Sequence, residues 1–236
     1  MALPLLNAPE FETTVPSTKQ PIKFRPFLVK EEKVLFMALQ GNNPKEMTNA
    51  VKNILSTCVL TDGFDVTKLA LFDVEYLFLK LRGKSVGESV ELKLRHKEGE
   101  CDHVTSVEVN LDDIEVSFPD NYEDKINLTE EVGIQLKHPG VNQADSLQSL
   151  EDSSYDSVLS LIADCVVCIY DSNNVYDTFT KQEIIEFIEN LNQQQFAKLQ
   201  SFFTSSPKLS HDISWKCEKC GEVETITVEG LANFFT

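Results

Sequence analysis

The spacing of apolar residues predicts three helices in the first 85 positions. Residues 31–39 form a crowded apolar run that predicts a buried helix. Asn43 and Pro44, a capping residue followed by a first-turn proline, predict the start of a second helix. Its apolar residues recur at i, i+4, i+7, i+8 and i+11: Met47, Val51, Ile54, Leu55 and Cys58. A third helix, capped by Asp73, is apolar on nearly all sides, so we expect it in the core.

Between residues 89 and 137 the pattern changes to an alternation of apolar and polar positions, which is typical of strands. The alternating runs cover residues 90–94, 107–111, 114–118, 126–128 and 132–136. Short turns separate these runs, so the pattern predicts an antiparallel β-meander. Together these features predict an α+β fold in which an N-terminal helical cluster packs on the meander, followed by a helical segment and a C-terminal β-hairpin.

The second half begins with apolar residues at helical spacing from Tyr155 to Ile169. Thr180 and Glu183 form a capping box that predicts another helix, and a third helix follows it before Pro207. Residues 212–228 are expected to form a hairpin. A terminal apolar plug follows the hairpin and consists of Leu231, Phe234 and Phe235.

Proline and polar residues indicate where these parts are divided. Five prolines lie in the first 26 residues and bias them to an extended conformation: Pro4, Pro9, Pro16, Pro21 and Pro26. We therefore expect an extended N-terminal arm (1–22), a helical cluster with the meander (23–140), a polar connector (141–152) and an acidic helical segment with its hairpin (153–236).

The formal charge of −17 is unevenly distributed. Residues 140–195 contain ten acidic side chains and a single base, Lys181. Nucleic acid is not expected as a partner, because phosphate binding requires clustered Lys and Arg. The N-terminus does not have the pattern of a signal peptide, and no apolar run is long enough to insert into a membrane. We therefore expect the chain to fold in the cytoplasm, with its six cysteines as thiols or metal ligands.

The segment from Gly83 to Gly87 resembles two catalytic motifs. It has the G-x-S-x-G spacing of a hydrolase nucleophile elbow around Ser85, and Lys84 gives it the end of a phosphate-binding loop. The elbow requires a strand before the serine and a helix after it, whereas here the order is reversed. The phosphate loop requires a further glycine where Phe78 stands. A two-glycine turn from helix to strand is the interpretation we favour.

A candidate zinc knuckle lies in the C-terminal hairpin. Cys217 and Cys220, followed by a glycine, have the C-x-x-C-G spacing with which two thiolates bind one tetrahedral ion. One knuckle supplies two ligands, and the remaining two could come from His96, Cys101 and His103, near the turn of another predicted hairpin. At most four of these five residues would bind one structural zinc ion. A metal-free pair of hairpins remains the alternative.

The other cysteines and histidines give no catalytic pattern. Cys165 and Cys168 also have C-x-x-C spacing, but they lie within a predicted amphipathic helix rather than at its start, so we interpret them as core residues. His138 and His211 are expected at the surface. No catalytic constellation is evident, and we expect neither an enzyme nor a small-molecule substrate.

Four stretches carry a resemblance to a known family: FRPFLVKEEKVLFMAL at residues 24–39, FDVEYLFLKLRGKSVGE at 72–88, VNLDDIEV at 109–116, and the C-terminal hairpin with VEGLANFF. They resemble the T-even-like phage baseplate hub family, which comprises a small hub subunit of contractile tails and a related hub-assembly chaperone. The resemblance covers nearly the whole chain and implies no catalytic residues.

This resemblance implies a structural, non-enzymatic role in the baseplate hub. The implied partners are other hub and tail proteins and copies of the chain itself, and the implied location is the virion after assembly in the host cytoplasm. The alternatives are a chaperone absent from the virion, a zinc-ribbon adaptor in gene regulation, and a serine hydrolase that uses Ser85.

Overall fold

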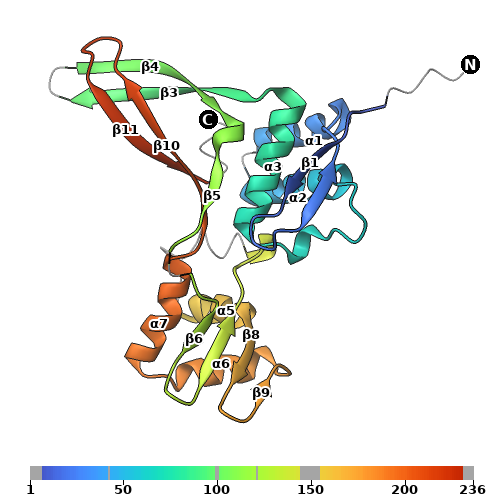
Figure 1. Cartoon of the computed structure of the whole chain (residues 1–236), viewed down its shortest axis with the longest axis vertical. Coiled ribbons are helices and arrows are strands. Elements are labelled where there is room, and N and C mark those ends of the chain that lie inside the picture. Colours follow the sequence, from blue (N-terminus) through green and yellow to red (C-terminus); the bar gives the residue numbers. More distant parts are fainter. Residues whose placement is uncertain (1–6, 42, 99–100, 121, 144–154, 231–236) are drawn as a thin grey trace, which may run out of the picture. The chain divides into compact units, whose positions relative to one another are not determined.

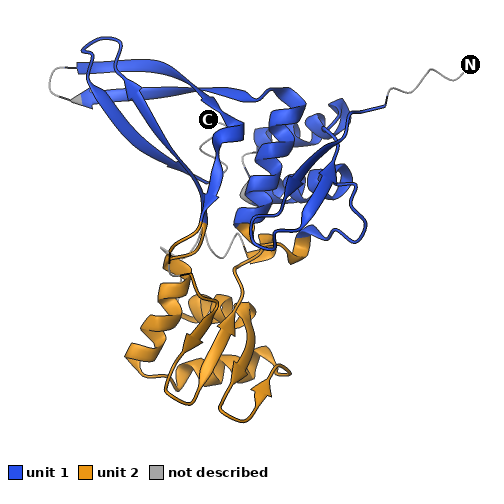
Figure 2. Ribbon diagram, in the orientation of Figure 1, with its two compact units in different colours: residues 1–66, 72–117, 208–236 blue, residues 67–71, 118–207 orange. Residues whose placement is uncertain are grey.

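The computed structural model describes residues 7–41, 43–98, 101–120, 122–143 and 155–230. The chain forms two compact units, shown in Figure 2. Unit 1 contains residues 1–66, 72–117 and 208–236, and unit 2 contains residues 67–71 and 118–207. The divisions thus differ from those expected. The C-terminal hairpin belongs with the N-terminal half, and unit 2 starts well before the proposed connector, most of which lies outside the described residues.

Residues 11–24, which include the second half of the expected extended arm, form a β-hairpin instead. Strands β1 (Phe11–Thr14) and β2 (Pro21–Phe24) pair antiparallel. Val15 and Ile22 are buried, so apolar burial holds this hairpin on its own unit. The backbone amide and the hydroxyl of Ser17 donate to the buried carboxylate of Asp73 at 2.9 and 2.5 Å. Asp73 therefore anchors the hairpin turn.

Two of the three N-terminal helices are arranged as predicted. Helix α2 (Pro44–Cys58) begins after Asn43, whose side chain accepts a hydrogen bond from the Lys45 amide. Helix α3 (Leu71–Val86) is the core helix, although it starts two residues before the expected cap. It also continues through Gly83, which is buried, so the expected two-glycine hinge is wrong and only Gly87, with φ of 156°, follows the helix.

Helix α1 (Val29–Gly41) forms where predicted but is not buried. Only Glu31 and Ala38 are buried, because one narrow face meets the rest of the unit. The carboxylate of Glu31 accepts from Arg25 at 3.1 Å and from the Leu28 amide at 2.8 Å, which fixes the start of the helix. The exposed apolar side chains of α1 are Val29, Val34, Phe36, Met37 and Leu39.

The other strands of unit 1 form two sheets (Figure 1). Strands β3 (Ser89–Glu98) and β4 (Cys101–Asn110) make a long antiparallel hairpin, and a short 3-10 turn, η2 (Leu111–Asp113), follows it. Strand β10 (Lys208–Lys216) lies between β5 (Glu115–Ser117) and β11 (Val223–Glu229). The core beneath them includes Leu79, Val90, Leu92, Val109, Leu111, Ile114, Leu209, Ile213 and Val228.

Unit 2 is a four-stranded antiparallel sheet with helices. Its strands β6 (Lys125–Asn127), β7 (Gly133–Leu136), β8 (Val166–Tyr170) and β9 (Val175–Tyr176) pair in sequence order. Helices α5 (Tyr155–Cys165), α6 (Lys181–Glu189) and α7 (Gln193–Thr204) contribute to its core. The Thr180–Glu183 capping box is present as predicted. Short 3-10 turns η1 (Val66–Lys68) and η3 (Val141–Gln143) complete the described elements.

The structure has the predicted mixture of helices, antiparallel strands and a C-terminal hairpin. The single meander, however, is wrong, because its strands belong to separate sheets in two units. Alternation fixes which face of a strand is buried but not which strand it pairs with. No helix within the described ranges is apolar and long enough to cross a bilayer. The expected terminal plug lies outside the described residues.

Candidate metal centre

Four candidate ligands meet in unit 1. His96 lies near the end of β3, Cys101 begins β4, and Cys217 and Cys220 lie in the turn between β10 and β11. The imidazole nitrogen and the three sulfur atoms all lie within 4.8 Å of one another. In Figure 1 the ends of β3 and β4 lie beside the β10–β11 turn. Donors far apart in the sequence thus converge on one point.

The distances within the cluster describe a compact set of thiols and one imidazole. The sulfur atoms of Cys101 and Cys217 are 3.9 Å apart, and the Cys220 sulfur is 3.4 Å from Nδ1 of His96. All three cysteines are free, and the 3.9 Å separation far exceeds the ~2.05 Å of a disulfide bond. His96 and Cys217 are buried, whereas Cys220 reaches the surface.

Backbone amides in the β10–β11 turn favour the thiolate form of Cys217. The amides of Cys220 and Lys219 donate to this sulfur and lower the pKa of Cys217 to about 6. The Cys217 amide donates to the Glu222 carbonyl at 2.8 Å, and the Gly221 amide donates to the Cys217 carbonyl at 2.9 Å. Gly221 has φ of 81°, a conformation that glycine adopts without strain.

The surroundings of Cys101 favour its protonated thiol. Desolvation and hydrogen bonds to the neighbouring sulfurs of Cys220 and Cys217 raise the pKa of Cys101 to about 11. Negative charge on one sulfur therefore disfavours charge on the next, as expected for like charges at short range. A cation among the sulfurs would remove this conflict.

His96 is fully buried and has acidic groups on its other side. Its Nε2 atom lies 3.3 Å from a carboxylate oxygen of Glu222 and 3.3 Å from one of Glu224. Neither contact has the geometry of a hydrogen bond in the structure. The ring also meets Trp215 edge-on, at a centroid distance of 6.3 Å. The Nδ1 atom faces the cysteines, so the two nitrogens have different environments.

The fifth candidate from the sequence, His103, is not part of the cluster. It lies opposite His96 in the β3–β4 register, but its Nε2 atom is 3.8 Å from a carboxylate oxygen of Glu218. The structure thus brings together four of the five candidate ligands: His96, Cys101, Cys217 and Cys220.

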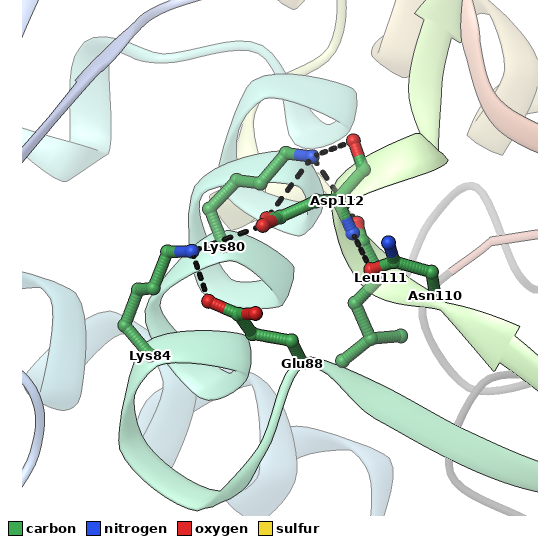
Figure 3. Close-up of polar contacts among 6 residues, drawn as sticks. All are labelled: Lys80, Lys84, Glu88, Asn110, Leu111 and Asp112. Carbon is green, nitrogen blue, oxygen red and sulfur yellow. Dashed lines mark hydrogen bonds and ion pairs between the residues drawn. The ribbon is translucent and has the colours of Figure 1, made fainter.

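Lys84, from the phosphate-loop look-alike, lies in a polar network shown in Figure 3. Its ammonium group contacts the carboxylates of Glu88 at 2.5 Å and Asp112 at 2.9 Å, and these partners raise the pKa of Lys84. Lys80 donates to the carbonyls of Leu111 at 3.1 Å and Asp112 at 2.8 Å, while desolvation lowers its pKa. The network pins α3 to the turn after β4.

Ser85, from the nucleophile-elbow look-alike, is engaged on both sides of its hydroxyl. The hydroxyl donates to the Leu81 carbonyl at 2.6 Å and accepts from the Phe27 amide at 3.0 Å. It therefore joins α3 to the segment that precedes α1. Hydrogen bonds to backbone groups on both sides indicate a structural role for this hydroxyl.

The second C-x-x-C is not within a helix as expected, because Cys165 ends α5 and Cys168 lies in β8. Both thiols are buried, and desolvation raises the pKa of Cys165 to about 12. Burial of this kind suppresses thiolate chemistry. The two residues pack as core cysteines.

His138 is more enclosed than the expected surface residue. Its ring stacks on Phe202 at 4.7 Å and on Tyr122 at 5.1 Å between centroids. Its nitrogens lie 2.7 Å from the Tyr122 hydroxyl and 2.9 Å from the Ser206 hydroxyl. Burial lowers the pKa of His138 to about 4, so the ring is neutral at pH 7. The residues next to His138 in the sequence did not indicate this burial, because the side chains that surround its ring are distant in the sequence.

His211, the other histidine expected at the surface, is half-buried.

The comparisons with known proteins give one match. A model of the T4 bacteriophage base plate protein family matches residues 8–236. No curated protein and no solved structure gives a significant match.

Proposed function

Because the chain belongs to the family of T4 bacteriophage base plate proteins, we propose that it is a structural component of the central hub of a contractile-tail baseplate. The family match over nearly the whole chain is the observation that carries this proposal. In this role the chain is assembled with other hub and tail proteins in the host cytoplasm and remains in the virion. Its function consists of protein contacts rather than chemistry.

The exposed apolar side chains of α1 support a role in protein contacts. We refer to Val29, Val34, Phe36, Met37 and Leu39 as the α1 surface. Val29, Phe36 and Leu39 recur at i, i+7 and i+10, which places them on one face of the helix. They are 80%, 59% and 51% exposed. Exposed apolar side chains that gather on one face of a helix commonly mark a protein-binding site. We propose that the α1 surface binds another baseplate protein.

The acidic character of unit 2 supports a choice among such partners. The stretch between positions 140 and 195 contains ten acidic residues and a single base. Surface charge of one sign repels proteins of the same sign and increases the association rate with basic ones. We therefore expect unit 2 to face a basic surface in the assembled hub.

The catalytic look-alike supports a non-enzymatic role. Lys84 is held by Glu88 and Asp112, and the Ser85 hydroxyl is held by two backbone groups. The motif is therefore accounted for by the contacts of α3, without a substrate.

The α1 surface provides the test. A phage that lacks the gene would be complemented with the double variant Phe36→Gln, Leu39→Gln. Both side chains are exposed, so we expect the free energy of unfolding to change by no more than ~0.5 kcal/mol each. We expect few complete baseplates by electron microscopy, because the hub contact loses its apolar anchors.

The matched control is Glu32→Gln, Lys33→Gln, which changes two exposed polar residues of the same helix and should restore assembly. A wild-type yield of baseplates from the Phe36→Gln, Leu39→Gln variant would show that the α1 surface is not needed for assembly. Complete baseplates in the phage that lacks the gene would contradict the proposed function itself.

A further inference from the structure

We propose that His96, Cys101, Cys217 and Cys220 bind one structural Zn²⁺ ion, which fastens the β10–β11 turn to the end of the β3–β4 hairpin. This inference is independent of the proposed hub function. It rests on the distances, the chemistry and the surroundings of the four donors.

Two of the six separations between the donors match the edges of a tetrahedral zinc site, and all six are within 4.8 Å. With Zn–S bonds of ~2.3 Å and a Zn–N bond of ~2.0 Å, the edges of the tetrahedron are ~3.8 Å between sulfurs and ~3.5 Å between sulfur and nitrogen. The structure has 3.9 Å between the sulfurs of Cys101 and Cys217. It has 3.4 Å between the Cys220 sulfur and Nδ1 of His96. Both edges agree with the expected geometry to within a few tenths of an ångström.

The donor set selects the metal and its role. Three cysteines and one histidine are a common structural zinc set, whereas Ca²⁺ and Mg²⁺ require oxygen donors. Four protein donors close the tetrahedron and leave no position for a substrate or an activated water. The site therefore supplies stability rather than catalysis.

The acidic residues beside His96 complete the site. A metal on Nδ1 requires the proton of the neutral imidazole to be on Nε2. That nitrogen lies 3.3 Å from the carboxylates of Glu222 and Glu224. Carboxylates in this position commonly accept the second N–H of a metal-binding histidine and hold its ring in place. The fully buried ring of His96 would then have the ion on one side and two carboxylates on the other, which lie close to Nε2 without forming a hydrogen bond in the structure.

The ion would join segments that are far apart in the chain. Cys101 and Cys217 are separated by 116 positions, and His96 and Cys220 by 124. Another link between the two regions is the hydrogen bond that the Glu218 amide donates to the Thr105 hydroxyl at 3.3 Å. Loss of zinc should therefore loosen the β10–β11 turn. The apolar core of unit 1 should retain the rest of its fold.

The direct test is the zinc content of the purified full-length chain without an affinity tag, measured by inductively coupled plasma mass spectrometry. We expect about one zinc per chain for the wild type, as for a closed structural site. The variant Cys217→Ser, Cys220→Ser should lose more than about nine-tenths of it, since half of the donors are removed. Wild-type protein that binds no zinc even after titration with zinc chloride would overturn the proposal.

His103→Ala is the matched control, because it removes a histidine of the same hairpin that lies outside the cluster. It should keep all of the zinc, and loss of zinc in this variant together with full content in His96→Ala would overturn the assignment of ligands. If the Cys217→Ser, Cys220→Ser variant does not fold, the absorption spectrum of wild-type protein loaded with Co²⁺ provides the test instead. We expect thiolate-to-cobalt charge transfer and the strong visible bands of tetrahedral Co²⁺. Weak octahedral bands would overturn the proposed coordination.

Discussion

Replacing Ser85 with alanine distinguishes a structural hydroxyl from a catalytic one. The substitution removes the acceptor of the Phe27 amide, and Phe27 is buried. A buried amide without a partner costs about 1 to 3 kcal/mol. The bond to the Leu81 carbonyl contributes little, since a hydroxyl that bonds back to its own helix does not stabilise that helix. Because water can reach the partly buried site, we expect a loss of about 1 to 2 kcal/mol.

Urea unfolding followed by tryptophan fluorescence measures this loss. The single tryptophan, Trp215, is buried in unit 1, the same unit as Ser85, so its emission reports on the unfolding of that unit. Thr57→Ala is the matched control. It removes a hydroxyl that bonds back to the Asn53 carbonyl at an exposed position of α2. We expect the control to change stability by no more than ~0.5 kcal/mol.

Two outcomes would contradict a structural role for the Ser85 hydroxyl. A Ser85→Ala protein with the unfolding midpoint of the wild type would show that the bond to Phe27 does not stabilise the unit. A variant of wild-type stability that cannot assemble baseplates would assign Ser85 a chemical role. We expect assembly to continue below the unfolding temperature of the variant.

Two further predictions concern one core residue in each unit. Phe78→Ala removes a ring that is 2% exposed, so it should lower the free energy of unfolding of unit 1 by about 3 to 5 kcal/mol in the same urea assay. A loss below ~1 kcal/mol would contradict the core position of α3. His138 has a pKa of about 4 when folded and about 6.5 when unfolded, so its neutral form stabilises unit 2 fully above pH 6.5. That stabilisation should be lost as the pH falls from 6.5 to 4, by roughly 1 to 2 kcal/mol after allowance for partial solvent screening. Thermal unfolding followed by circular dichroism should show a smaller decrease for His138→Gln, and an equal decrease would contradict the assignment.

Local signals in the sequence predicted the elements whose ends depend on short-range contacts. Asn43 caps α2 and Thr180 caps α6, because a capping side chain bonds to amides two or three residues away. The β10–β11 hairpin was predicted for a similar reason, since its turn and strands are contiguous. The boundary after Cys165 was missed, although the β-branched residues that follow it favour a strand.

Contacts between distant residues could not be derived in the same way. Apolar content in α1 predicted burial, but hydrophobic side chains also cover much of a protein surface, and five apolar side chains of this helix are exposed. The spacing of Cys217 and Cys220 indicated half of a metal site. It did not distinguish His96 from His103, because both lie near the same turn and only the folded hairpin shows which ring faces the cysteines.

Quantitative mass spectrometry of purified virions shows whether the chain is a component of the mature baseplate hub. A hub component should be present in mature particles at a fixed ratio to the other baseplate proteins, and it should remain after the particles are washed in high salt. Detection of the chain in assembly intermediates but not in mature virions would contradict it and would identify the chain as an assembly chaperone.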